Sequence, residues 1–168
     1  MTGAPSVAMQ LSVIEIAHLS TIVDDFAVLL AEPSPADPAL ERLTPAAYPD
    51  DEDASREFRR LTRDDSLSRR SDDAGAVLRS LRTAGIVDEV TELTEDEAAR
   101  VVLLALDDDD LGSWMRTLAA VRLVLAERLG IRQDGDDPGE DPRAFVYDWL
   151  GYLLESLVHA TEPGEARE

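Results

Sequence analysis

Cysteine and lysine are both absent from this chain of 168 residues, and each absence excludes a class of chemistry. Without cysteine there is no disulfide, thiolate nucleophile, cysteine-ligated zinc or thiol redox switch. Without lysine there is no P-loop lysine and no Schiff-base lysine, and all 16 basic side chains are arginines. His18 and His159 are the only imidazoles, and no nucleophile-elbow, dinucleotide-binding or P-loop motif occurs. The sequence therefore predicts a protein that is not an enzyme.

Long apolar runs are also missing. No apolar run exceeds six residues, the length of the run at 101–106, whereas a membrane-spanning helix needs about 20. The first 30 residues carry no arginine, so they lack the charged start of a signal peptide. We expect a cytoplasmic protein that does not contact a membrane.

Acidic residues dominate what is present. The chain has 36 Asp and Glu against 16 basic residues, for a net charge of −20. Such a field repels phosphates, which argues against nucleic acid as a partner. Two acidic runs do not fit the pattern of an EF-hand loop, because frames that start at Asp107 and Asp134 place Leu118 and Phe145 where the glutamate ligand belongs. We expect solvated acidic segments, with no metal and no cofactor.

Helical periodicity dominates the apolar pattern and predicts a mainly all-α fold. The prediction is a single-domain bundle of about five helices over residues 1–160, followed by a disordered tail at 161–168. Both tryptophans fall in the last two predicted helices, where we place the core, with Phe145 in the buried stripe of the last helix. The helices are expected at 13–31, 55–85, 94–106, 110–129 and 143–160, with a short turn at 39–43. Residues 55–85 are expected to form one or two helices, because a capping-box pattern at Thr62 and Asp65 favours a break near residue 62 in the second case.

A short two-stranded β element is also predicted. One strand is expected near residues 7–11, and its partner near residues 88–93, where β-branched residues are frequent. Thr94 and Glu97 form a capping box that opens the following helix, and Gly130 is a residue typical of a helix end.

One side of the last predicted helix is polar. At 100° per residue, four side chains fall within about 60° of one another. They are Asp148, Tyr152, Glu155 and His159. A metal site is one interpretation, but a catalytic metal usually has three protein ligands. We favour a structural polar edge, in which Arg122 and Arg128 of the preceding helix pair with Asp148 or Glu155.

Positive charge gathers in one segment. Residues 56–82 hold eight of the sixteen arginines and five acidic residues, so this window is +3 while the rest of the chain is −23. The candidate partner-binding residues are Arg56, Arg59, Arg60, Arg63, Arg69 and Arg70, of which the first four recur along one helix face. Two interpretations remain open: a docking surface for an acidic partner, or an internal counter-charge that relieves self-repulsion.

Several blocks of the sequence resemble a known family. They are EFRRLTRDD at 57–65, WMRTLAAVRLVLAERLGI at 114–131 and VYDWLGYLLESLV at 146–158, preceded by PALERLTPAAYPDD at 38–51. Together they are similar to the actinobacterial domain-of-unknown-function family 2017. The resemblance implies a small cytoplasmic, mostly helical protein without established catalytic residues. Some family members are described as oxidative-stress transcriptional regulators.

Three functions follow as hypotheses. The leading one is a non-enzymatic regulator that binds a protein partner through the arginine face, in transcription or stress response. The second is direct DNA binding through the segment from Arg56 to Arg82, against which the net charge argues. The third is a carboxylate- or metal-dependent enzyme, which no motif supports. A homodimer is a further partner hypothesis.

Overall fold

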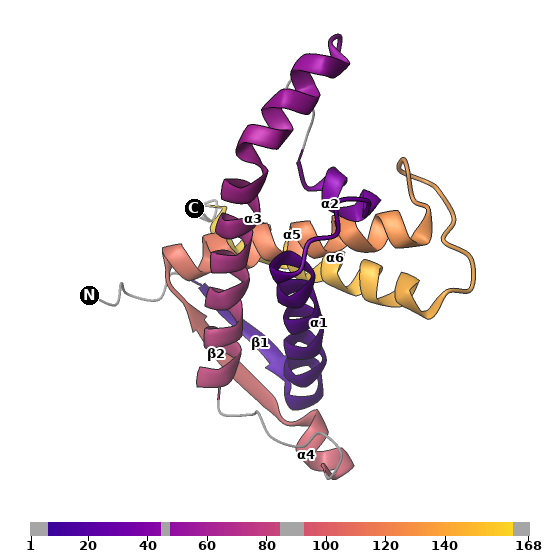
Figure 1. Cartoon of the computed structure of the whole chain (residues 1–168). Helices are drawn as coiled ribbons and strands as arrows, with labels where there is room; N and C mark the ends of the chain where they lie inside the picture. Colours follow the sequence, from indigo (N-terminus) through magenta and orange to yellow (C-terminus); the bar gives the residue numbers. More distant parts are fainter. Residues whose placement is uncertain (1–6, 45–47, 85–92, 163–168) are drawn as a thin grey trace, which may run out of the picture.

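The computed structural model describes residues 7–44, 48–84 and 93–162. Its elements, in chain order, are β1 (Val7–Ser12), α1 (Val13–Ala31), α2 (Pro38–Arg42), α3 (Glu52–Thr83), α4 (Glu95–Ala99), β2 (Val101–Leu106), α5 (Asp108–Leu129) and α6 (Pro142–Thr161) (Figure 1). The predicted mainly-α class and the small sheet are confirmed. Residues 163–168, most of the predicted tail, lie outside the described part. Among the described helices, none has both the length and the apolar composition that crossing a bilayer requires.

The sheet consists of β1 and β2 in antiparallel register, from Val7 opposite Leu106 to Ser12 opposite Val101. The predicted position of the second strand was wrong. Of the predicted segment, residues 88–92 lie outside the described residues, and Leu93 is not in a strand. The partner of β1 is instead Val101–Leu106, which the sequence placed in a helix.

The physical reason lies in a short helix and a buried face. The capping box at Thr94 and Glu97 is present, as predicted, but α4 ends after five residues, at Ala99. The run that follows gains a full ladder with β1 and buries Leu104 and Leu106 against the core. Pairing with a distant strand outweighed the local helical pattern.

The core lies between the sheet and the helices around α5. Trp114 and Leu118 of α5 are fully buried, and Leu150 of α6 is also fully buried. The predicted core in the last two helices is therefore present, but α1 and the second half of α3 also contribute buried apolar side chains to it. Phe145 was predicted to be buried and is 76 % exposed, because it lies in the first turns of α6, before the buried stripe begins at Leu150.

α3 is one continuous helix, so of the two alternatives for residues 55–85 the single helix is confirmed and the break near Thr62 is wrong. The Thr62 hydroxyl donates to the carbonyl of Phe58, at 2.8 Å, and does not cap a new helix. Most of the buried residues of α3 lie from Leu67 onward. The first turns project beyond the other elements (Figure 1), and they leave one side of α3 free to line clefts.

Two other helix ends match the sequence signals. Asp107 caps α5 by accepting from the amide of Asp110, at 2.9 Å, so the acidic run does begin a helix. Gly130 ends α5 with φ of 72°, a left-handed conformation that favours glycine.

Candidate functional site

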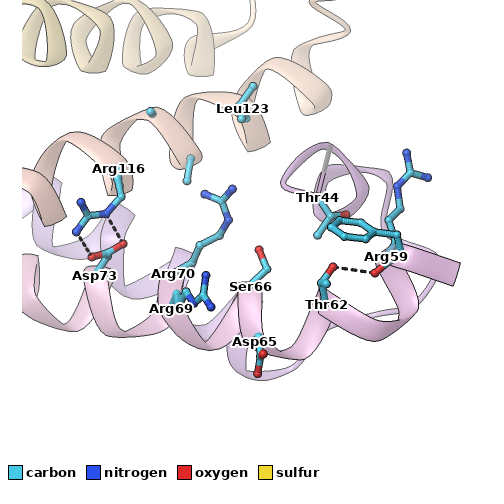
Figure 2. Close-up of a pocket in the computed structure, with 13 residues that line it drawn as sticks. Thr44, Arg59, Thr62, Asp65, Ser66, Arg69, Arg70, Asp73, Arg116 and Leu123 are labelled. Atoms are coloured by element: carbon cyan, nitrogen blue, oxygen red, sulfur yellow. Dashed lines mark hydrogen bonds and ion pairs between the residues drawn. The ribbon is translucent and has the colours of Figure 1, made fainter. Parts of the chain in front are cut away.

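The predicted partner-binding arginines of α3 line two clefts. The first, which we call the α3–α5 cleft, has a volume of about 600 Å³ and lies between residues 58–73 of α3 and 116–123 of α5, with Thr44 also lining it (Figure 2). The second, the α2–α3 cleft, has a volume of about 890 Å³. Arg59, Arg69 and Arg70 line the first cleft, while Arg56, Arg59, Arg60 and Arg63 line the second.

Two of the six arginines pair with acidic residues on their own helix. The Arg56 guanidinium lies 3.1 Å from the Asp53 carboxylate. Arg60 donates twice to Glu57, at 2.8 and 3.1 Å, and this hydrogen bonding lowers the pKa of Glu57 below its usual value. These two arginines act as internal counter-charges, which is one of the two interpretations that the sequence left open.

Two more arginines donate to backbone carbonyls. Arg63 Nη2 donates to the carbonyl of Ser34 at 3.3 Å, and Arg70 Nη2 donates to that of Leu43 at 2.8 Å. These two hydrogen bonds connect α3 to the segments that precede and follow α2. Burial lowers the pKa of Arg70, an effect that the charge of Asp73 opposes. A carbonyl satisfies a donor but carries no full charge, so neither guanidinium is neutralised by this contact.

Three arginines of the α3–α5 cleft form no ion pair within the described part of the chain: Arg59, Arg69 and Arg70, which we call the arginine cluster. The Nε atoms of Arg59 and Arg70 are buried and lack a hydrogen-bond partner there. The side chain of Arg70 extends from α3 toward α5 (Figure 2). The cluster therefore presents donors that an anionic group can accept from.

The opposite wall holds a basic residue that the sequence analysis did not single out. Arg116 of α5 donates to the carboxylate of Asp73 of α3 from Nε at 2.8 Å and from Nη2 at 2.7 Å. The Ser113 hydroxyl donates to the same carboxylate at 3.0 Å. The hydrogen bond from Arg116 is the largest cause that lowers the pKa of Asp73. This pair joins the two walls of the cleft, and the charge of Asp73 also acts on Arg70.

Apolar side chains complete the α3–α5 cleft. Ala119, Ala120 and Leu123 line it from α5, and Phe58 lines it from α3. Phe58 is 40 % exposed and Leu123 is 37 % exposed. The sequence analysis missed these residues because it treated charge alone as the signal. Exposed apolar positions on helices with a buried stripe could have indicated them.

The positive surface extends beyond α3. Two smaller clefts adjoin the first two through shared lining residues, among them Leu123, Arg59 and Thr44. Ten of the sixteen arginines and seven acidic residues line these four clefts. From the sequence, arginines can be counted only along one helix. In the folded chain, the same cleft-lining surface also includes Arg42, Arg116, Arg122 and Arg132.

The predicted polar edge has different partners. Arg128 binds Asp37 at the start of α2, at 2.9 and 2.7 Å, and this hydrogen bonding lowers the pKa of Asp37. The prediction that Arg128 pairs with Asp148 or Glu155 was therefore wrong. α2 packs on α5, so an N-cap carboxylate of α2 meets the guanidinium instead of a carboxylate of α6.

Arg122 contacts α6, but not through a carboxylate. Its Nε donates to the carbonyl of Tyr147 at 3.2 Å, and the guanidinium lies 4.2 Å from the centre of the Tyr147 ring. A Cβ at Gly151 would lie 3.0 Å from this guanidinium, so glycine provides the room for it. The predicted pairing with Asp148 or Glu155 was wrong because the aromatic face and the carbonyl hold the arginine.

The four polar residues of α6 stay at the surface. Asp148, Tyr152, Glu155 and His159 are all exposed. His159 Nδ1 lies 2.8 Å from the carbonyl of Glu155, and this contact raises the pKa of His159. His18 is exposed on α1. Within the described residues, no group of three or more histidine, aspartate and glutamate side chains is arranged to hold a metal ion.

Comparison with known proteins gives one match. The family model for the domain of unknown function DUF2017 matches residues 2–161. No curated protein and no solved structure matches the chain. Because the match spans nearly the whole sequence, including α3 and both walls of the α3–α5 cleft, the chain belongs to the DUF2017 family.

Proposed function

We propose that this chain is a non-enzymatic protein that binds an acidic segment of a partner protein through the arginine cluster. One observation supports the proposal above all others. In a molecule of net charge −20, three guanidinium groups share a cleft and none forms an ion pair with a described carboxylate. Charge-assisted hydrogen bonds to carboxylates are among the strong polar contacts of proteins, so an acidic ligand gains most at this place.

The counter-charge interpretation explains only part of the arginine surface. It requires each arginine to neutralise acidic groups of the same chain, as Arg56 and Arg60 do. Arg59 and Arg69 form no such pair in the described part of the chain, although 36 acidic residues are present. The cluster therefore supports docking.

Aromatic residues beside the cluster favour a protein as partner. Tyr48 and Phe58 lie edge to face with ring centres 6.1 Å apart, and both are exposed. Arginine and aromatic side chains are enriched where protein interfaces gain most of their binding energy. Duplex DNA is a poorer ligand, because the net negative charge of the molecule repels the DNA phosphates at long range. A role in transcription or stress response would then operate through protein contact, because thiol sensing requires cysteine.

A charge-matched pair of variants tests the proposal. R59A/R69A removes two cluster arginines that make no intramolecular hydrogen bond among the described residues, and R79A/R82A removes two exposed arginines that line none of the four clefts. Both variants change the net charge equally. Each is cross-linked in extracts of the native cells, and captured proteins are quantified by mass spectrometry.

We expect an acidic protein to be captured by the wild type and by R79A/R82A, and to be lost with R59A/R69A. Equal capture by all three would contradict the proposal. A DNA filter-binding measurement at two salt concentrations runs in parallel. Salt-sensitive binding to DNA that R59A/R69A abolishes would replace the protein partner with nucleic acid.

A further inference from the structure

The two walls of the α3–α5 cleft differ in chemistry. On α3, Arg59 lies toward one end and Arg69 and Arg70 toward the other, with the small polar side chains of Thr62 and Ser66 between them. Asp65 also lines this wall, but its side chain points away from α5 (Figure 2). The α5 wall between Arg116 and Leu123 has no charged side chain among its lining residues. A ligand that fits both walls carries acidic groups toward α3 and apolar groups toward α5.

The spacing of the arginines matches helical geometry. Arg59 and Arg70 are eleven residues apart, which is about three turns and about 16 Å along the axis of α3. Two acidic residues eleven positions apart on another helix have the same separation and share one face. An extended peptide covers that distance with about five residues, whose side chains alternate between opposite sides. A helix thus presents both acidic groups to α3 and keeps a continuous apolar stripe for α5.

The α5 wall favours close approach. Ala119 is small and partly exposed, and Leu123 follows it at helical spacing with 37 % of its surface exposed, while Ala120 is buried between them. Small residues on one helix let the side chains of a second helix pack near its backbone. Leucine side chains of a helical ligand on this wall would cover Leu123. The methylene groups of Arg59 and Arg70 would add to the apolar contact surface. A purely acidic segment leaves this surface uncovered.

We propose that the α3–α5 cleft receives an amphipathic α-helix of the partner, which seats apolar side chains on Ala119 and Leu123 and places acidic side chains on the arginine cluster. This inference rests on the proposed function and specifies the shape and chemistry of the partner segment. The recognition mode is a helix in a groove, with anchors along one helical stripe.

Two synthetic peptides test the inference. The first is a fluorescent amphipathic peptide with two glutamates eleven positions apart and leucines along the adjacent helical stripe. The second has serines in place of the leucines, so the charge is the same. We expect the leucine peptide to bind at least about tenfold more tightly, from the burial of its anchors. We also expect its helical circular dichroism to increase on binding.

Two protein variants separate the apolar contribution from the charge. L123S removes the exposed anchor contact of the α5 wall, and L103S is its control, because Leu103 is an exposed leucine of β2, outside the lining of the cleft. L123S should bring the affinity for the leucine peptide close to that for the serine peptide, while L103S should leave it unchanged. R59A/R69A should weaken both peptides.

The outcomes distinguish this inference from the proposed function. Equal binding of both peptides that R59A/R69A still weakens overturns the helix inference and supports docking of acidic segments in general. Binding of the leucine peptide without a gain in helical signal also overturns it. If neither peptide binds, the inference falls, and the capture experiment in native extracts decides separately on the proposed function.

Discussion

Asp73 is the residue on which the geometry of the α3–α5 cleft depends most directly. It accepts hydrogen bonds from Arg116 and from Ser113, and its side chain is only 16 % exposed. The amide of asparagine keeps the shape and loses the charge. We expect D73N to lower the free energy of unfolding by about 1–2 kcal/mol, since Arg116 is largely exposed and solvent weakens the pair. D72N, which changes an exposed neighbour, should stay within about 0.5 kcal/mol in the same urea titrations.

The contribution of Asp73 should also depend on pH. Its pKa is lowered in the folded protein, mainly by Arg116, so its ionised form stabilises the fold. This stabilisation is complete above the unfolded-state pKa of about 3.9, and it is lost as the pH falls through the lower pKa of the folded state. The difference in unfolding free energy between wild type and D73N should therefore be constant at neutral pH and shrink below about pH 4. A difference that persists unchanged at lower pH would show that the charge of Asp73 is not the cause.

The sequence identifies the charged residues of α3, but it does not show which residues they form ion pairs with. The arginine face of α3 was visible from the spacing of Arg56, Arg59, Arg60 and Arg63, because helical positions follow from the sequence alone. Which of them pair with a carboxylate depends on neighbours from other elements. Asp73 with Arg116 is such a pair, 43 residues apart, and no local pattern indicates it.

Glycines provide a matched test at the scale of the helix. Gly130 has φ of 72° and an added Cβ would meet nothing within 4 Å, so G130A should cost about 1 kcal/mol through backbone conformation alone. Gly75 lies inside α3, where an added Cβ would make only an ordinary contact with Arg79. We expect G75A to raise the free energy of unfolding by about 0.5–1 kcal/mol. Thermal unfolding followed by circular dichroism checks both. The same sign for both variants would contradict the assigned helix end.

The strand β2 can be tested by the alternation of its side chains. Leu104 is 4 % exposed, whereas Leu103 is 62 % exposed. In a strand, adjacent residues point to opposite faces, so L104A should destabilise by about 2–5 kcal/mol while L103A stays within about 0.5 kcal/mol. Urea unfolding of both variants gives the comparison. Equal losses would be inconsistent with the strand.

Local signals predicted helix starts better than helix extents. The boundaries of α1 and the caps at Thr94, Asp107 and Gly130 follow from residues within one turn. The change from α4 to β2 does not, because the strand forms only where β1, about 90 residues earlier in the chain, offers its edge. The continuity of α3 past Thr62 also depends on packing of its second half against α1 and α5.

For the whole molecule, net charge shapes both stability and recognition. At −20, the folded chain repels itself, and salt screens this repulsion over a distance of about 10 Å at 0.1 M. We expect the melting temperature to rise when NaCl is added from low ionic strength, because the compact state gains more from screening than the ion pairs lose. Differential scanning calorimetry over a salt series tests this. A falling melting temperature would mean that ion pairs such as Asp37 with Arg128 dominate.

Folding also brings arginines from several elements together on one surface. Ten of the sixteen arginines line four adjoining clefts on one side of the fold, so a strongly acidic chain presents a locally positive surface. The sequence predicted six of these ten arginines, all on α3, and missed the contributions of α2, α5 and the loop after α5. Those elements meet α3 only through tertiary packing.

The central claim is that Arg59, Arg69 and Arg70 bind an acidic ligand. The side-chain Nε–H resonances of these arginines are the most direct measure of such binding. In two-dimensional NMR spectra recorded during titration with the acidic amphipathic peptide, the resonances of these three residues should shift together and saturate, while those of Arg79 and Arg82 stay in place. Uniform small shifts of all arginines, or shifts confined to residues outside the α3–α5 cleft, would contradict the account.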